Sequence, residues 1–152
     1  MPKIDENQRM LLLMGLGVLV LLILLVYVNY NSPHIPALVT VGGYNYYVLL
    51  ATTPQQWQHG LMDYRFSCSK PSMCVNGMLF LFNGKGSECF WMKDTPEPLT
   101  QTWIANGTVT NVYNAIPEST TNVCAYGGEV LELYQNLPRN ISVGSPVTVT
   151  TS

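Results

Sequence analysis

The feature that most constrains this chain is an uninterrupted apolar segment near its N-terminus. Residues 10–28 read MLLLMGLGVLVLLILLVYV and contain no charged residue and no proline. As a helix rising about 1.5 Å per residue, this segment would extend about 28 Å, which is close to the thickness of the hydrocarbon core of a bilayer. We therefore expect a single transmembrane helix over residues 10–30.

A cleaved signal peptide is the alternative interpretation of this segment. The apolar part of a signal peptide is usually about 7–15 residues long and ends at small residues. Here the segment is longer and ends in Val26-Tyr27-Val28-Asn29-Tyr30, without an A-x-A-like cleavage site. The sequence therefore favours a retained membrane anchor.

Basic residues predict how the anchor is oriented. Lys3 and Arg9 precede the apolar segment, and the next basic residue after it is Arg65. Positive charges near a span favour the cytoplasmic side. We expect residues 1–9 in the cytoplasm, residues 31–37 as an extended spacer, and residues 38–152 as an extracytoplasmic domain at the cell membrane.

The cysteines and two sequons agree with an oxidising, extracytoplasmic location. The four cysteines are Cys68, Cys74, Cys89 and Cys124. They allow three pairings, of which we favour Cys68 with Cys74 and Cys89 with Cys124. Asn106 and Asn140 each begin an N-x-S/T sequon and are candidate glycosylation sites.

Metal and cofactor sites find little support in this sequence. Zinc sites normally bring ligands in C-x₂₋₄-C pairs, and the cysteine spacing here contains none. The histidines are His34 and His59, and neither lies near a cysteine in sequence, as a copper site would need. We expect neither a metal nor a cofactor.

Residues 38–152 show the pattern of a mainly-β domain. Short apolar runs alternate with turn signals such as Asn83–Gly86 and Asn106-Gly107. Strands are expected at 38–41, 44–51, 78–82, 89–92, 102–105, 109–113, 130–134 and 147–150. One short helix is expected between a Thr53 N-cap and Gly60. This predicts a small α+β fold dominated by strands, a compact sandwich or barrel-like domain with one short helix.

Charge excludes one class of partner. Only 11% of the chain is charged, and residues 31–152 carry five basic and seven acidic side chains. Binding to phosphate backbones requires a basic patch. We expect no nucleic-acid partner.

Five segments of the chain resemble a known family. They are Gly60-Leu61-Met62, Gly77–Phe82 (GMLFLF), Phe90–Thr95 (FWMKDT), Pro98-Leu99 and Val130–Leu133 (VLEL). The series resembles the domain of unknown function 192 family, whose members show G-L-M, G-M-L-F and F-W-M-K-N-T blocks in this order. The resemblance implies a compact mainly-β domain, frequently exported or membrane-anchored, without an established reaction. Asp94 stands where asparagine is usual, and Thr100 stands where aspartate is usual.

The FWMKDT segment contains the candidate ligand-binding residues Trp91, Lys93, Asp94 and Thr95. Strand alternation would place Trp91, Lys93 and Thr95 on one face. A lysine beside a tryptophan can bind an anionic or sugar-like ligand. In the structural alternative, Phe90 and Met92 pack in the core while the charged pair lies at the surface.

Two functions remain open from the sequence. The first is a membrane-anchored interaction or ligand-binding module, held to the membrane by residues 10–30. Its partner would be a membrane protein, a cell-surface assembly or a glycan. The second is a hydrolase of envelope glycan that uses acidic residues near the Phe90–Thr95 strand. The candidate carboxylates are Asp94, Glu97, Glu118, Glu129 and Glu132. No catalytic residue is assigned, because no nucleophile motif is present.

Overall fold

The computed structural model describes residues 5–30, 36–65 and 74–151. The chain divides into two compact units, Met1–Pro33 and His34–Ser152. The first unit contains one long helix and the second contains the β domain, and each is described by itself below.

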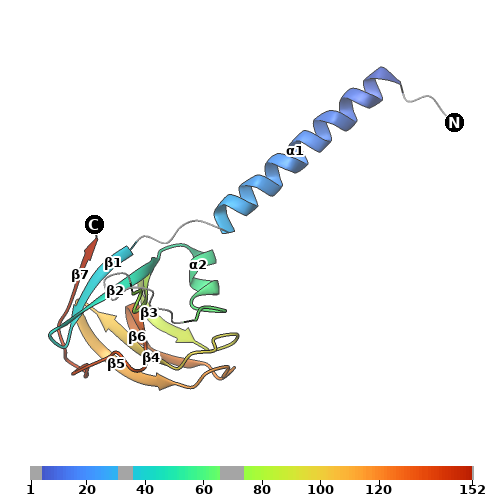
Figure 1. Ribbon diagram of the computed structural model, residues 1–152. Helices are drawn as coiled ribbons and strands as arrows, with labels where there is room; N and C mark the ends of the chain where they lie inside the picture. Colours follow the sequence, from blue (N-terminus) through green and yellow to red (C-terminus); the bar gives the residue numbers. More distant parts are fainter. Residues whose placement is uncertain (1–4, 31–35, 66–73, 152) are drawn as a thin grey trace. The chain divides into compact units, whose positions relative to one another are not determined.

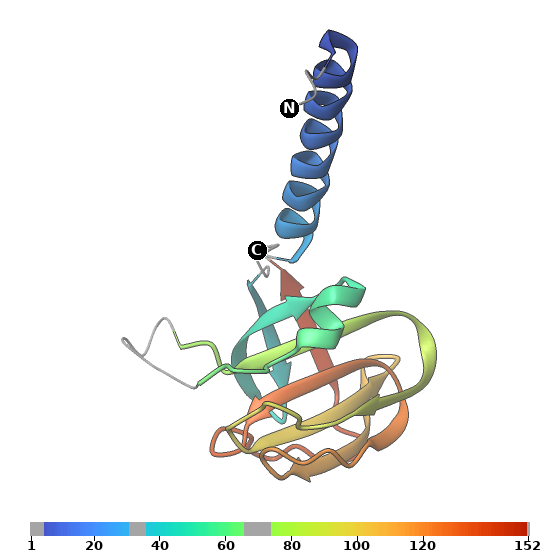
Figure 2. The same cartoon turned by 90° about the vertical axis from the view of Figure 1, so that its right-hand side faces the viewer.

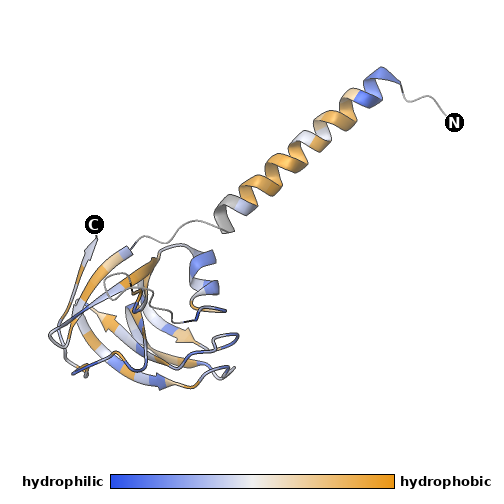
Figure 3. Cartoon of the chain, in the orientation of Figure 1, coloured by the Kyte–Doolittle hydropathy of each residue, from blue (hydrophilic) through white to orange (hydrophobic). Residues whose placement is uncertain are grey.

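Helix α1 (Glu6–Tyr30) contains the whole apolar segment. Figure 3 colours most of this helix hydrophobic between its first turn and its last. All side chains described in this helix are exposed, so no protein core covers them. The helix is therefore long and apolar enough to span a membrane.

Seven strands of the described chain form a single sheet. They are β1 (Pro36–Val41), β2 (Tyr44–Ala51), β3 (Gly77–Phe90), β4 (Leu99–Ala105), β5 (Thr108–Ala115), β6 (Val123–Tyr134) and β7 (Val147–Thr151). Their order is β5-β4-β6-β3-β2-β1-β7 (Figure 1). Strands β2 and β3 run parallel, and the other neighbours run antiparallel.

The sheet curls on itself (Figure 2). A bridge between Thr108 and Pro146 links the start of β5 to the residue before β7, so the two edges of the sheet approach each other. The mainly-β, barrel-like architecture with one short helix is confirmed.

Local signals set the first hairpin and the short helix. Gly42 and Gly43 form the β1–β2 turn with φ angles of 62° and 81°, which glycine adopts without steric cost. Helix α2 (Pro54–His59) begins with a capping box, in which Gln56 N donates to Thr53 Oγ1 at 3.3 Å. In return, Thr53 N donates to Gln56 Oε1 at 3.2 Å. The predicted bounds of this helix are confirmed.

Several predicted boundaries are wrong, and the largest shift is at β6, which begins at Val123 rather than at residue 130. Asn83–Gly86 does not reverse the chain, because β3 absorbs these residues in a register shift and continues alongside β6. Strand β3 ends at Phe90, so residues 91–95 form a turn rather than a strand. Strand β1 begins at Pro36, so the last two residues of the predicted spacer belong to the sheet.

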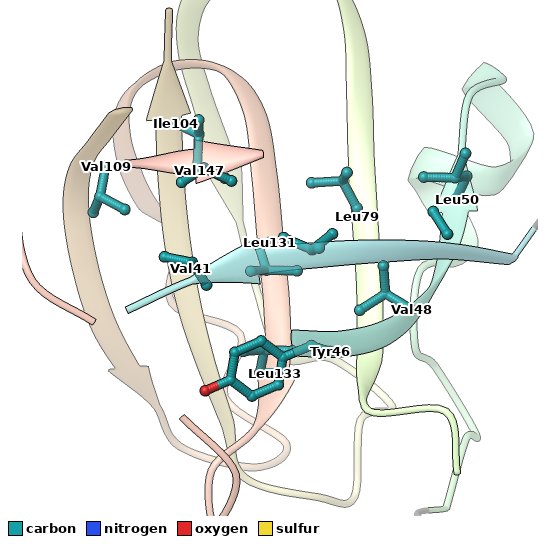
Figure 4. Close-up of a cluster of buried hydrophobic side chains, with 12 residues drawn as sticks. Val41, Tyr46, Val48, Leu50, Leu79, Ile104, Val109, Leu131, Leu133 and Val147 are labelled. Atoms are coloured by element: carbon teal, nitrogen blue, oxygen red, sulfur yellow. The ribbon is translucent and has the colours of Figure 1, made fainter. Parts of the chain in front are cut away.

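The centre of the curled sheet, made of β4, the start of β3 and the end of β6, is buried on both faces. Its concave face holds an inner core whose side chains point toward one another (Figure 4), among them Val48, Leu79 and Leu131. Alternate residues of the same strands, such as Phe80 and Val130, form an outer core. Leu61 and Met92, from the segments after α2 and β3, cover that outer core. Burial of these strands on both faces is one reason why the sequence carries few charges.

Candidate functional site

Four of the five segments behind the family resemblance meet at one small cavity, and Pro98-Leu99 does not line it. The residues that these four segments contribute to its lining are Gly60, Leu61, Met62, Phe80, Phe90, Trp91, Thr95 and Glu132. Trp57, Gln58 and His59 of α2 complete the lining. We call this space, about 30 Å³ in volume, the Glu132 cavity. Residues more than 70 positions apart in sequence thus share one site, which lies on the outer face of the sheet.

A tight turn after β3 positions the Trp91–Thr95 segment. Thr95 N donates to Met92 O at 3.1 Å, and Asp94 adopts a left-handed φ of 53°. Met92 N donates to Ser119 O at 2.8 Å, which holds the turn against the loop after β5. The buried Met92 side chain anchors the turn in the outer core.

The turn separates the four predicted ligand residues. Trp91 and Thr95 line the Glu132 cavity, whereas Lys93 and Asp94 do not. Lys93 Nζ lies 3.9 Å from Asp94 Oδ2, with both side chains about half exposed. It also lies 5.5 Å from the centroid of the Trp91 ring. The predicted face of Trp91, Lys93 and Thr95 is wrong, because a turn does not alternate as a strand does.

Glu132 supplies the carboxyl group of the cavity. Its side chain is only 3% exposed. Gln101 lies directly opposite it on β4 and donates Nε2–H to Glu132 Oε1 at 3.0 Å. Burial raises the pKa of Glu132 to about 7, although the hydrogen bond from Gln101 acts in the other direction. At neutral pH this carboxyl can therefore exchange a proton or accept hydrogen bonds.

Tyr134, next on the same face of β6, is electrostatically coupled to this carboxyl. Its pKa rises to about 12, chiefly through burial and then through the charges of Glu97, Tyr64 and Glu132. Glu97 and Glu132 therefore act on the same phenol.

An open groove lined with aromatic rings adjoins the cavity. It has a volume of about 480 Å³, and we call it the aromatic groove. Its lining residues are Pro54, Trp57, Gln58, Phe82, Glu88, Cys89, Phe90 and Trp91. Trp57, Gln58, Phe90 and Trp91 line both spaces, so the two form one site.

Ring contacts and hydrogen bonds hold the walls of the groove in place. Trp57 packs on Phe82 with ring centroids 5.1 Å apart and donates Nε1–H to Ala51 O at 3.0 Å. Phe90 packs edge-to-face on Phe80, with centroids 4.8 Å apart. Trp91 is 44% exposed and leaves part of its ring open to a ligand.

The predicted Cys89–Cys124 disulfide joins directly opposed residues of β3 and β6, with their Cα atoms 4.0 Å apart. It braces the wall of the aromatic groove that contains Cys89. Cys74 is also disulfide-bonded, whereas Cys68 lies outside the described residues. Pairing of Cys68 therefore stays a prediction.

The two sequon asparagines are exposed and lie in turns. Asn106 and Asn140 have φ angles of 54° and 55°, respectively. Asn106 Oδ1 accepts a hydrogen bond from Lys85 Nζ. Glycosylation of either residue stays a prediction.

The candidate carboxylates do not gather at one point. Among the described acidic residues, Glu132 lines the cavity and Glu88 lines the groove. Burial raises the pKa of Glu129, which lies with Lys85 in a separate hollow of about 300 Å³. Within the described ranges, no group of three or more His, Cys, Asp or Glu side chains could hold a metal ion.

Sequence reasoning missed the importance of Glu132, Gln101 and Trp57. Glu132 was one of five candidate carboxylates, and its only distinguishing signal is its position inside the apolar run VLELY. Its pairing with Gln101 depends on the register of β4 and β6, which local sequence does not specify.

Comparison with known proteins gives two similar solved structures. A candidate transcription regulator from Sinorhizobium meliloti 1021 is 28% identical, with a TM-score of 0.65, over 78% of this chain and 97% of that chain. A protein of unknown function from Novosphingobium aromaticivorans DSM 12444 is also 28% identical. Its TM-score is 0.61 over 76% of this chain and 84% of that one. No curated protein matches.

The family comparison covers nearly the whole β domain. The family model DUF192, described as Uncharacterized ACR, matches residues 37–149. The match includes all four segments that meet at the Glu132 cavity. The chain therefore belongs to the domain of unknown function 192 family.

Proposed function

We propose that this protein is a membrane-anchored ligand-binding module whose ligand occupies the aromatic groove and reaches the Glu132 cavity. The observation that carries this proposal is the convergence of four of the five family segments on one site. A purely structural role would not require these segments to leave a space beside an exposed tryptophan. The groove also falls in the size range of small-ligand sites, about 300–1,000 Å³.

The chemistry of the walls supports ligand binding. Trp57, Phe90 and Trp91 offer flat apolar surfaces for stacking and van der Waals contact. Glu132 offers a hydrogen-bond acceptor at the adjoining cavity. An apolar site with a few convergent polar groups is typical of small-molecule recognition.

Anchoring and location belong to the same proposal. The exposed apolar surface of α1 supports membrane insertion. Lys3 and Arg9 before the span favour a cytoplasmic N-terminus, and with a single span the β domain would then lie outside the cytoplasm. The Cys89–Cys124 disulfide agrees with an oxidising compartment. The partner or ligand would then lie at the cell membrane or cell surface.

Intact-mass analysis of the protein from membranes tests the anchor. We expect a mature chain that retains residues 1–30 and requires detergent for extraction. A mature chain that begins near residue 31 would contradict the anchor and leave only a secreted domain.

Saturation-transfer NMR on the full chain in nanodiscs tests ligand binding. The probes are mono- and disaccharides and capped single amino acids. We expect at least one probe class to bind, and Trp91→Ala to abolish that binding. Tyr113→Ala is the matched control, because Tyr113 is an exposed ring on β5 that lines neither space. Equal loss in both variants, or binding that neither affects, would contradict this site.

A glycan hydrolase is the second candidate function, and the environment of Glu132 favours it. A carboxyl with a pKa of about 7 suits a general acid. Release of reducing ends from purified cell-envelope glycan tests this activity. A hydrolase would lose it in Glu132→Gln, whereas absence of release by the wild-type chain would exclude it.

The description of the Sinorhizobium protein as a transcription regulator is not carried over to this chain. Residues 31–152 have more acidic than basic side chains. Such a balance does not favour DNA binding.

A further inference from the structure

Carboxyl groups are the main charged type of side chain among the described residues that line the combined site. Among the residues that line the aromatic groove and the Glu132 cavity, the acidic ones are Glu88 and Glu132. Among the residues that the structure describes, neither lysine nor arginine lines either space, and His59 is a lining side chain that can become a cation. Lys93 lies two residues after the lining residue Trp91. Its Nζ pairs with Asp94 Oδ2 at 3.9 Å. The described part of the site therefore offers a buried carboxyl without a lining lysine or arginine to neutralise it.

We propose that the site binds a primary alkylammonium group, supplied by a lysine side chain of a polypeptide partner. The alkyl stem lies along the aromatic groove, and the ammonium group enters the cavity beside Glu132. This inference rests on the proposed function and names the chemistry of its ligand.

Size supports an ammonium group. The Glu132 cavity has a volume of about 30 Å³, which is room for about two water molecules. An ammonium group fits in this space, whereas a sugar ring or an aromatic ring is far larger. A larger ligand would have to leave its ring in the groove and extend a single small group into the cavity.

The walls support a cation on an alkyl stem. Methylene groups of lysine pack favourably on apolar surface while the charged end reaches a polar partner. Tryptophan faces attract cations within about 6 Å. Trp91 already has the Lys93 ammonium 5.5 Å from its centroid, so this ring accepts a cation within the protein itself.

Charge complementarity decides between ligand classes. An anionic ligand would meet Glu132 and Glu88 without a lysine or arginine among the described lining residues to offset the repulsion. A neutral apolar ligand would leave the buried carboxyl without a charge partner. A cation satisfies both the carboxyl and the aromatic walls.

The open groove favours a polypeptide source over a free amine. Its volume of about 480 Å³ far exceeds that of the cavity, so it has room for residues that flank a lysine. A free diamine would leave much of this surface in water.

Binding should depend on the ionisation of Glu132. The titratable groups around it are His59 from α2, Tyr134 from β6, and Glu88 in the adjoining groove. Because burial raises the pKa of Glu132 to about 7, the ionised form increases above that pH while the lysine remains protonated. Affinity should therefore rise between pH 6 and pH 8.5.

Titration calorimetry on the full chain in nanodiscs tests the inference. The probes are N-acetyl-lysine-N-methylamide, its norleucine analogue, which lacks the ammonium group, and 1,5-diaminopentane. We expect the lysine probe to bind at least tenfold more tightly than either comparison probe. Norleucine binding as tight as lysine binding would overturn the ammonium assignment, and tighter diaminopentane binding would overturn the polypeptide source.

Two matched substitutions on β6 test whether the ammonium group pairs with Glu132. Glu132→Gln should weaken the lysine probe at least tenfold, whereas Glu129→Gln, in a separate hollow on the same strand, should not. Thermal melting shows whether each variant is folded. If a variant does not fold, the comparison of the lysine and norleucine probes on the wild-type chain still tests the inference. Equal effects of the two substitutions would contradict the inference.

Trp91→Ala distinguishes failure of the ammonium inference from failure of the proposed ligand site. If lysine and norleucine probes bind equally and Trp91→Ala abolishes both, the ammonium inference fails but the groove remains the ligand site. If Trp91→Ala leaves binding of every probe unchanged, the proposed site fails as well.

Discussion

Gln101 and Glu132 occupy directly opposed positions on β4 and β6, and the amide of Gln101 donates to the carboxyl of Glu132 at 3.0 Å. The two side chains are 1% and 3% exposed. A neutral amide orients the carboxyl without cancelling its charge, so burial still raises the pKa of Glu132 to about 7. This relationship keeps a titratable group available beside the aromatic groove.

The stability of the β domain should fall as pH rises from about 4.5 to 7. The pKa of Glu132 is raised from 4.5 to about 7, so the folded state holds this proton more tightly than the unfolded state. The resulting stabilisation is complete below the unfolded pKa and is lost as pH rises through the folded pKa, for a total of roughly 3 kcal/mol. Denaturant midpoints of the wild-type chain and Glu132→Gln test this, and a pH slope unchanged by the substitution would contradict it.

Thr102→Val should leave stability unchanged or increase it by about 1 kcal/mol. Thr102 is fully buried, and its Oγ1 has no hydrogen-bond partner among the described residues. Valine keeps the shape of the side chain and removes the unsatisfied polar atom. Thermal denaturation measures the change. A loss of more than about 1 kcal/mol would show that the hydroxyl has a bound partner.

Gly77→Ala should strongly destabilise the β domain, by about 3 kcal/mol or more. A Cβ at this position would lie 1.8 Å from the backbone oxygen of Glu132, so β3 would have to move away from β6. Gly84→Ala is the control on the same strand, because a Cβ there meets no atom within 4 Å. Similar melting temperatures for the two variants would contradict the close approach of β3 and β6 at Gly77.

The sequence predicts a structural feature correctly when the residues that determine it are close together in the chain. The helix from Thr53 to Gly60 and the Gly42-Gly43 hairpin are set by neighbouring residues, so their predicted positions are correct. Asn83–Gly86 gives an equally strong local turn signal, yet pairing with β6 on both sides keeps it within one strand. Tertiary pairing overrides local preference at that point.

The candidate site shows the same difference between features set by neighbouring residues and features set by distant ones. The FWMKDT segment indicated that Trp91 and Thr95 belong to a site, and both line the Glu132 cavity. The turn at residues 92–95 depends on hydrogen bonds to the distant loop at Ser119, which local pattern does not reveal. The pairing of Gln101 with Glu132 likewise requires the strand order of the sheet.

The Cys89–Cys124 disulfide should stabilise the β domain by about 4 kcal/mol in the chain-entropy model. The two residues are 35 positions apart, so the bridge restricts a sizeable loop of the unfolded chain. A Cys89→Ala and Cys124→Ala double variant should therefore unfold at a much lower denaturant concentration. A midpoint equal to that of the oxidised wild-type chain would contradict this role.

The most direct test of the ligand site follows the indole N–H signals of the chain's three tryptophans in NMR spectra. Trp57 and Trp91 line the aromatic groove, whereas Trp103 is fully buried and donates its indole N–H to Glu88 O. Titration of the full chain with N-acetyl-lysine-N-methylamide should shift the Trp57 and Trp91 signals together in a saturable manner, with a much smaller change at Trp103. Saturable binding of this probe that leaves both groove signals in place would contradict the account.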